Sequence, residues 1–327
     1  MSQVSRHQLG LVLVLTTVVA FLVFLSWPPG ATGAGPGGGT TRPSPSATTP
    51  VTQQGQAGIG PSLVPPTSAP ATATTRPLAT GRWPGPTTAG VRNGSTVAAW
   101  TGGTAGVDAT SGRTYDHVSV PAPVSGAWTF TGSNLTFRDC RFSVGVVFTG
   151  NNIRLDHCDI AGGVTLRGNA KVTLVGNDIH GWDTGILVSG DPRKVTDVSV
   201  TDNWIHTPRA ACDSHADGIR LLGVDRITIS NNTVDLGPWI PCGPLGSAIT
   251  VEPAQGSDTN LTITNNLLNG GAYTVRFVAC SKTTFEANHF GPDAHTAMVD
   301  TPAYPACFTK WSGNLADATG KPVSPSS

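Results

Sequence analysis

Five residues in the middle of the chain carry groups suited to proton transfer and charge stabilisation: Asp183, Asp213, His215, Asp217 and Arg220. In a lyase, His215 or an arginine would remove the proton beside a uronate carboxylate, while Arg220 and Arg276 neutralise that carboxylate. In a glycosidase, Asp183 and Asp217 form the best acid and base pair. The carboxylates of Asp183, Asp213 and Asp217 also offer clustered oxygen ligands for Ca²⁺, the one cofactor that these residues point to.

Seven copies of one pattern indicate the elements that position these residues. Each copy is an apolar-alternating strand, then one or two polar residues, then Asn or Cys, then an apolar residue two positions on. The shared positions are Cys140, Cys158, Asn177, Asn203, Asn232, Asn266 and Asn288. Spacings of 18 to 34 residues indicate a solenoid whose stacked coils share a core. Stacked side-chain amides can then hydrogen-bond from coil to coil at the ~4.8 Å strand spacing.

A second strand follows in each coil, and it carries the candidate site. These strands are 128–130, 146–148, 164–166, 186–188, 219–221, 249–251, 275–277 and 298–300. If Ile219 and Leu221 point inward, Arg220 points outward, together with Thr250 and Arg276 in the same column. The sequence therefore predicts that these three side chains share one outer wall.

The middle coils are the longest, so extra residues accumulate in loops 207–218 and 235–247 beside this wall. Loops inserted on one face of a solenoid usually shape its binding surface. The substrate-binding candidates are Thr250, Glu252, Tyr273, Arg276, Trp182 and Trp239. The two tryptophans would offer flat apolar faces for sugar rings. These features predict a carbohydrate groove on the middle coils.

Short strands joined by Gly and Asn corners predict an all-β fold, a right-handed parallel β-helix of about seven to nine coils. The segments DNWIH (202–206), HADGIR (215–220), ITISNNTV (227–234) and GSAITV (246–251) resemble the pectate-lyase-like right-handed parallel β-helix superfamily. Within it, they resemble secreted actinobacterial proteins with an HxDGI segment. The resemblance covers about residues 91–314. It implies a protein that cleaves, epimerises or binds acidic or complex polysaccharides.

The cysteines occupy matching places in neighbouring coils. We expect the disulfides Cys140–Cys158, Cys212–Cys242 and Cys280–Cys307, because stacked neighbours lie within the reach of a disulfide. An exported chain also meets an oxidising compartment. A zinc site is the alternative, but the chain has no CxxC or HExxH spacing.

The chain before the repeats divides into two compositional zones. Residues 9–27 are an uncharged apolar run long enough to span a membrane, and Arg6 before it favours a cytoplasmic N-terminus. We expect residues 1–27 to be a cytoplasmic tip and membrane anchor, with a cleaved signal peptide as the alternative. Residues 28–88 predict a disordered linker, 89–316 the β-helix and 317–327 a disordered tail. The β-helix would be extracellular, either anchored through the N-terminal helix or secreted after cleavage.

The charge composition argues against one class of binding partner. The 20 Lys and Arg residues balance 20 Asp and Glu residues, which argues against a nucleic-acid binder.

We expect a monomer that binds a polysaccharide or cell-wall glycan and cleaves it, or a non-catalytic glycan-binding or structural module of the cell envelope. The candidate site residues also have purely structural interpretations. Asp217 before Gly218 suits a tight corner, where its side chain would bond backbone amides. Arg220 and Arg276 also suit surface ion pairs.

Overall fold

The computed structural model describes residues 82–92, 97–100, 111–123, 126–209, 212, 214–241, 245–253, 256–302 and 304–325. The regular elements of this part are strands, and no helix in it has the length and apolarity to cross a membrane. The expected anchor and most of the expected linker lie outside the described residues. The chain divides between Ala71 and Thr72 into two units, and every described residue belongs to the second.

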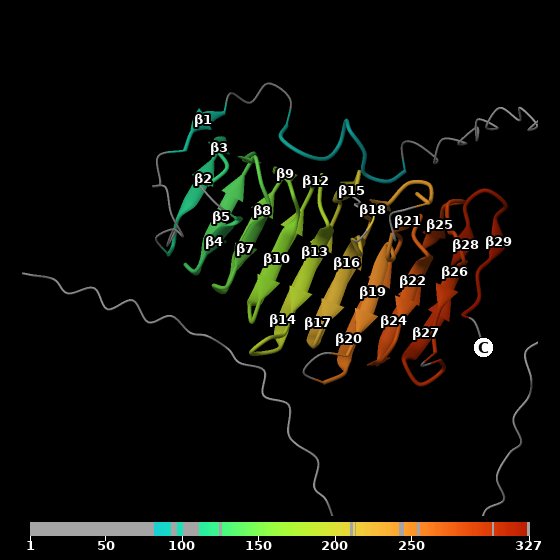
Figure 1. Cartoon of the computed structure of the whole chain (residues 1–327). Helices are drawn as coiled ribbons and strands as arrows, with labels where there is room; N and C mark the ends of the chain where they lie inside the picture. Colours follow the sequence, from blue (N-terminus) through green and yellow to red (C-terminus); the bar gives the residue numbers. More distant parts are fainter. Residues whose placement is uncertain are drawn as a thin grey trace, which may run out of the picture. The chain divides into compact units, whose positions relative to one another are not determined.

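Most coils of the described part add one short strand to each of three sheets, which we call A, B and C (Figure 1). Sheet A contains β1 (Ala98–Ala99), β3 (Val118–Val120), β6 (Arg141–Phe142), β9 (Asp159–Ala161), β12 (Asp178–His180), β15 (Trp204–His206), β18 (Thr233–Asp235), β21 (Leu267–Asn269), β25 (His289–Phe290), β28 (Leu315–Ala316) and β29 (Lys321–Pro322). Sheet B contains β2 (Thr114–Asp116), β5 (Leu135–Arg138), β8 (Ile153–Asp156), β11 (Ala170–Val175), β14 (Val195–Thr201), β17 (Val224–Ser230), β20 (Asp258–Thr264), β23 (Cys280–Ser281), β24 (Thr283–Glu286) and β27 (Phe308–Ser312). Sheet C contains β4 (Trp128–Phe130), β7 (Val146–Phe148), β10 (Val164–Arg167), β13 (Thr184–Ser189), β16 (Asp217–Leu222), β19 (Ile249–Glu252), β22 (Tyr273–Phe277) and β26 (Ala297–Asp300).

Neighbouring strands pair in parallel throughout, except for the antiparallel pair β28 and β29. In sheet C the inward residues Val146, Val164, Ile186, Ile219, Ile249, Val275 and Val299 lie in one register column. The predicted second strands are therefore confirmed. The last one pairs one residue later than its sequence alignment, since Val299 and not Met298 stands opposite Val275.

The predicted ladder of buried amides runs between sheets B and A. Asn177 Nδ2 donates to Asn203 Oδ1 at 2.8 Å, and the same bond joins each following pair as far as Asn288 and Asn314. Each of these acceptor oxygens also receives the backbone N–H of the preceding ladder residue. The amides are buried, so these bonds satisfy groups that water does not reach. Asn314 is an additional member that the seven sequence copies did not include.

A single residue with positive φ turns the chain from sheet B to sheet A, immediately before each ladder position. These residues are Asp139, His157, Gly176, Asp202, Asn231, Asn265, Ala287 and Gly313. Gly, Asn and Asp dominate this column because they tolerate the left-handed conformation best. These corners turn the chain so that each following ladder residue lies inside the solenoid.

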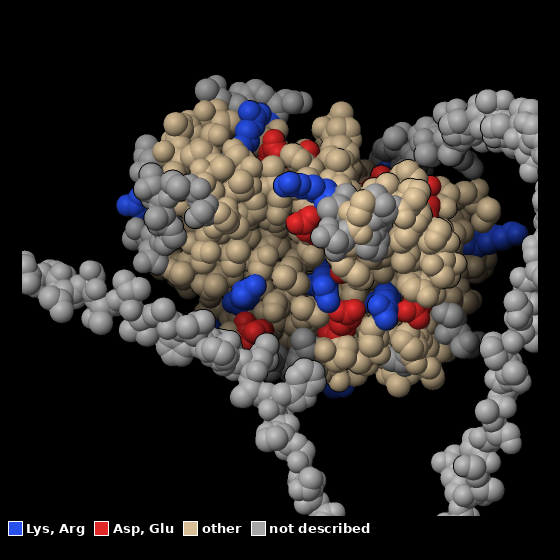
Figure 2. Space-filling view, viewed as in Figure 1, with Lys and Arg blue, Asp and Glu red and all other residues tan. Residues whose placement is uncertain are grey.

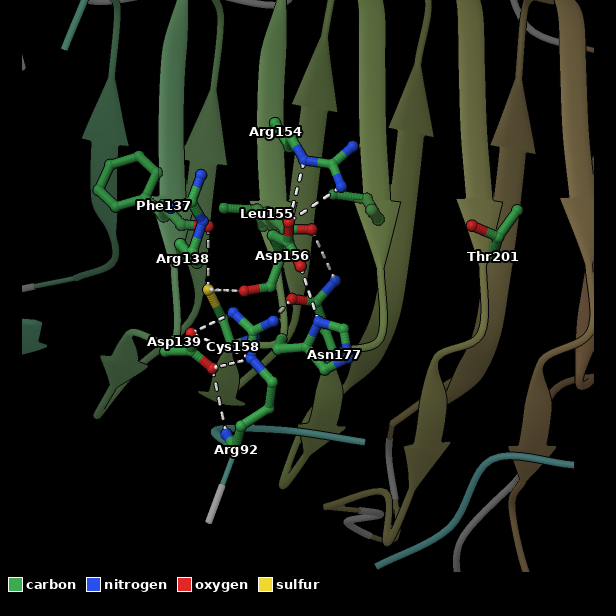
Figure 3. Close-up of polar contacts among 12 residues, drawn as sticks. Arg92, Phe137, Arg138, Asp139, Arg154, Leu155, Asp156, Cys158, Asn177 and Thr201 are labelled. Carbon is green, nitrogen blue, oxygen red and sulfur yellow. Dashed lines mark hydrogen bonds and ion pairs between the residues drawn. The ribbon is translucent and has the colours of Figure 1, made fainter. Parts of the chain in front are cut away.

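The expected disulfides differ in outcome. Cys280 and Cys307 form a disulfide, and Cys212 is disulfide-bonded, while its expected partner Cys242 lies outside the described residues. The expected Cys140–Cys158 disulfide is not formed, because both are free buried thiols. Cys158 Sγ donates to the Phe137 carbonyl, as Asn177 Nδ2 donates to Leu155 one coil later (Figure 3). The thiols thus continue the amide ladder, and burial raises the pKa of the Cys158 thiol.

Residues 82–92 lie across several coils, along the corners that join sheet B to sheet A. The folded body therefore begins earlier than the predicted start at residue 89. Trp83 is buried, and its Nε1 donates to the Asn265 carbonyl at 2.9 Å. Thr233 Oγ1 donates to the Pro84 carbonyl, and the Arg92 guanidinium binds the Asp139 carboxylate (Figure 3). Burial would raise the pKa of Asp139, but the hydrogen bonds from Arg92 lower it overall. This segment is part of the folded body, not of the linker.

The predicted disordered tail is also ordered as far as residue 325. Strand β29 pairs with β28, and Trp311 Nε1 donates to the Val323 carbonyl at 2.9 Å. Because β29 runs antiparallel, it covers the last edge of sheet A and ends the stack of coils.

We predict that replacing one amide of the ladder destabilises the fold strongly. Asn232→Ala leaves the backbone N–H of Asn203 and the carbonyls of Val200 and Ser230 without their partner. Buried groups that lose hydrogen bonds in this way cost about 2–4 kcal/mol of unfolding free energy in total. Urea denaturation followed by circular dichroism measures the loss. The control Thr228→Ala, at an exposed position, should stay close to the parent protein, and equal midpoints for the two variants would contradict the prediction.

We predict that one buried carboxyl gives the fold a distinct pH dependence. Asp258 is fully buried at the start of β20 and accepts a hydrogen bond from Val224 N. Burial raises its pKa from 3.8 to about 7, although hydrogen bonds from the backbone of Val224 and Gly223 act in the opposite direction. The folded protein therefore keeps this proton where the unfolded chain releases it, so stability falls as pH rises from 4 to 7 and levels off above. Asp258→Asn should flatten the curve by up to about 4 kcal/mol. Denaturation at several pH values tests this, and the exposed control Asp202→Asn should keep the parental slope.

Candidate functional site

The predicted outer wall of sheet C exists. Arg220, Thr250, Arg276 and Asp300 lie in one register column on β16, β19, β22 and β26. Arg220 Nη2 lies 2.7 Å from Glu252 Oε2, and Arg276 Nη1 lies 3.9 Å from Glu252 Oε1. Arg276 Nε lies 3.1 Å from Asp300 Oδ2. Positive and negative side chains therefore alternate across this face (Figure 2).

Asp217 forms the buried floor beside this row. Its side chain is 0% exposed, and its Oδ1 accepts hydrogen bonds from Ser247 N at 2.9 Å and Thr250 Oγ1 at 2.7 Å. Gly246 is required here, since a Cβ at that position would lie 2.2 Å from Asp217 Oδ1. The other oxygen, Oδ2, has no hydrogen-bond partner among the described residues. Because Asp217 is enclosed, it can position neighbouring groups but cannot itself touch a large substrate.

His215 is the exposed half of a histidine–aspartate pair. Its Nδ1 lies 3.4 Å from Asp217 Oδ2, and 57% of its side chain is exposed. The Asp217 carboxylate raises the pKa of His215 above its ordinary value, although partial burial opposes the shift. Since Nδ1 faces the carboxylate, Nε2 on the opposite side of the ring is the nitrogen that can exchange a proton with a ligand. We call His215, Asp217, Arg220, Glu252, Arg276 and Asp300 the sheet C cluster.

The other predicted site residues lie differently from expectation. Trp182 is 1% exposed, and its Nε1 donates to the Ile179 carbonyl, so it is a core residue and not a surface for sugars. Thr250 lies on the wall but is buried under it, where its hydroxyl holds Asp217. Asp183 is exposed and Tyr273 is half-buried at the start of β22. Asp213 lies outside the described residues.

Two residues of this region are not indicated by the sequence pattern. Asp300 was missed because the strand 298–300 had been aligned one residue out of register, which would turn Asp300 inward. His295 lies on the loop between β25 and β26, and its ring stacks on Trp239 with centroids 4.2 Å apart and planes 8° apart. The predicted aromatic surface is therefore a Trp–His pair, and a lone histidine in a loop gives no sequence signal for it.

A metal site at the predicted carboxylates finds no support among the described residues. Within that part of the chain the one group of three suitable ligands is Asp116, His117 and Asp139, far along the sequence from Asp183 and Asp217. The Arg92 guanidinium already binds the Asp139 carboxylate there. Asp217 uses one oxygen for Ser247 and Thr250, which leaves it poorly suited to a Ca²⁺ ion.

A separate hollow of about 530 Å³ lies on the outer face of sheet B. Thr173, Ser199 and Thr228 line it together with Asp197 and Arg226. Arg226 is held by Asp197 at 2.7 Å, and no residue of the sheet C cluster takes part. The hollow lacks an exposed histidine among its lining residues, so size alone does not make it the better site for chemistry.

These parallel coils, their inward columns and their amide ladder define a parallel β-helix. The chain belongs to the family described as "Right handed beta helix region", whose model matches residues 126–298. This match confirms the resemblance to the pectate-lyase-like superfamily and covers the strands that build the sheet C cluster. None of the curated proteins matches the chain.

Solved structures with a similar fold include tailspike proteins of E. coli bacteriophage HK620. A tailspike mutant with a two-residue deletion is 15% identical, with a TM-score of 0.48, and the match covers 68% of this chain and 46% of the tailspike. A double mutant in complex with a pentasaccharide is 15% identical, with a TM-score of 0.45, over 62% of this chain and 42% of the tailspike. The chain thus spans less than half the length of these tailspikes.

We predict that Asp217→Asn lowers the pKa of His215. The amide keeps an oxygen for Ser247 N and Thr250 Oγ1 but removes the negative charge that stabilises the imidazolium. NMR titration of the histidine Cε1 protons, with His215→Gln to assign the signal, measures the shift. As a matched control, Asp197→Asn on sheet B should leave the His215 titration unchanged. An unchanged His215 pKa in Asp217→Asn would show that the two side chains are not coupled.

Proposed function

We propose that the protein binds a polysaccharide along the outer wall of sheet C and cleaves it with His215 as the proton-transferring residue. The observation that carries this proposal is the pairing of an exposed imidazole with a fully buried carboxylate beside a row of charged side chains. A long open wall suits an extended polymer better than a small molecule, which usually needs an enclosed pocket.

The chemistry follows from the positions of the groups. His215 would exchange a proton with the glycan through Nε2, while Asp217 holds the ring and stabilises its protonated form. Arg220 and Arg276, each beside a carboxylate, would donate hydrogen bonds to oxygens of the glycan. Asp217 is thus a positioning residue, and His215 is the residue that touches the substrate.

Binding without cleavage is the second candidate, because both arginines of the cluster are already held by carboxylates. Side chains in such a row can recognise hydroxyl groups without taking part in a reaction. In either case, the apolar run at residues 9–27 and the Pro- and Thr-rich segment that follows suit a protein held at the cell surface.

The full-length protein should be incubated with plant and bacterial polysaccharides while new reducing ends and unsaturated ends are followed. We expect cleavage that His215→Gln lowers by about 10²-fold or more, the usual contribution of a general acid or base. Asp217→Asn should shift the pH profile to lower pH, which a purely structural residue would not do. The exposed control Asp197→Asn should keep parental activity. Binding without any new chain ends would favour the second candidate, and no binding to any glycan would refute both.

A further inference from the structure

The charges of the sheet C cluster are compensated within the protein. Arg220 and Arg276 face three carboxylates, those of Asp217, Glu252 and Asp300. The cluster therefore has a net charge of −1 when its carboxylates are ionised and His215 is neutral, and zero when His215 is protonated. Each arginine of the row has a carboxylate within 4 Å of its guanidinium group.

This arrangement disfavours an acidic polymer. A uronate carboxylate would have to displace Glu252 from Arg220 or Asp300 from Arg276, and it would meet the negative potential of the carboxylates that remain. The uronate would also lose part of its hydration on binding to the wall. An arginine that is already paired with a carboxylate does not offset this cost. The charge pattern thus argues against the substrate class that a uronate lyase would need.

The hydrogen-bonding groups that remain suit hydroxyl groups instead. Glu252 and Asp300 can accept additional hydrogen bonds, and the guanidinium groups beside them can donate. A sugar hydroxyl both donates and accepts, so two adjacent hydroxyls can bind one carboxylate and the neighbouring guanidinium at once.

A flat aromatic surface adds an uncharged contact on the loop side of the wall. The Trp239–His295 pair lies on the loops before β19 and β26, and His215 lies on the corresponding loop before β16. His295 N donates to the Gly271 carbonyl, and Gly271 pairs with Ser247, which holds Asp217. Such a pair can pack against the apolar face of a sugar ring.

From these contacts we infer that the ligand of the sheet C cluster is an uncharged glycan, built of neutral sugars or N-acetylated amino sugars, and not a polyuronate. The inference deepens the proposed function and rests on it. It assigns Glu252 and Asp300 the role of excluding acidic chains, and Arg220 and Arg276 the role of hydrogen-bond donors to hydroxyls.

Affinity electrophoresis or calorimetry with the full-length protein tests this inference. We expect neutral polymers, such as β-glucan, xylan or chitin oligosaccharides, to include one that binds at least about tenfold more tightly than polygalacturonate or alginate, a difference of about 1.4 kcal/mol. Binding of that polymer should change little between about 0.05 and 0.5 M salt, because no net charge attracts it. Equal or tighter binding of a polyuronate would overturn the inference, whereas the absence of all glycan binding would refute the proposed function itself.

A charge-removal variant provides the sharper test. Glu252→Gln with Asp300→Asn removes the nearest carboxylate from each guanidinium group and leaves only Asp217, 3.8 Å from Arg220 Nε. We expect its affinity for polygalacturonate to rise about tenfold or more, with strong weakening by salt. The matched control Asp197→Asn with Glu286→Gln removes two ion-paired carboxylates from sheet B and should not change glycan binding. The single variant Glu252→Gln, which alters only one position, serves if the double variant does not fold. Unchanged polyuronate affinity in a folded variant would overturn the assigned exclusion.

Discussion

The hydrogen-bonded ladder of buried side chains between sheets B and A is the interaction on which the rest of the structure depends. Each asparagine donates its backbone N–H and its side-chain Nδ2 to the amide oxygen of the next coil, so the ladder fixes register as well as holding the coils together. A slip of one residue would turn inward side chains outward in the neighbouring strand. The ladder therefore determines that Arg220, Thr250 and Arg276 stand in one column on the opposite side of each coil.

Regular stacking also explains how the wall can hold a buried carboxylate. Asp217 begins β16, and the next coil supplies Ser247 N and Thr250 Oγ1 at the height where they can bind its Oδ1. The open side of the same carboxylate faces His215, on the loop that enters β16. Two adjacent coils thus build this part of the site. One coil supplies His215 and Asp217, and the next coil supplies the hydrogen bonds that hold Asp217 in place.

The sequence was sufficient for the features that repeat. The amide positions, the second strands and the shared wall of Arg220 and Arg276 all follow from one period, and the structure has them there. Features that occur only once in the chain could not be predicted from the repeat. Residues 82–92 have linker-like composition and are ordered through contacts with distant coils, while Trp182 belongs to the buried core. Cys140 and Cys158 were placed correctly, but their position favours a hydrogen bond to the preceding coil over a disulfide.

The described residues contain a few buried polar atoms without a hydrogen bond, three of them on the wall and three elsewhere, at Asn169, Asp258 and Thr274. Along the ladder every amide is bonded on both sides, yet Asp217 Oδ2 and the Nε atoms of Arg220 and Arg276 have no hydrogen bond among the described residues. Unmade hydrogen bonds of this kind cost stability. Because the ladder and the core hold the coils independently of these atoms, the fold can tolerate that cost on one outer face. The same regularity that makes the solenoid stable therefore leaves the outer face of sheet C available for the proposed site.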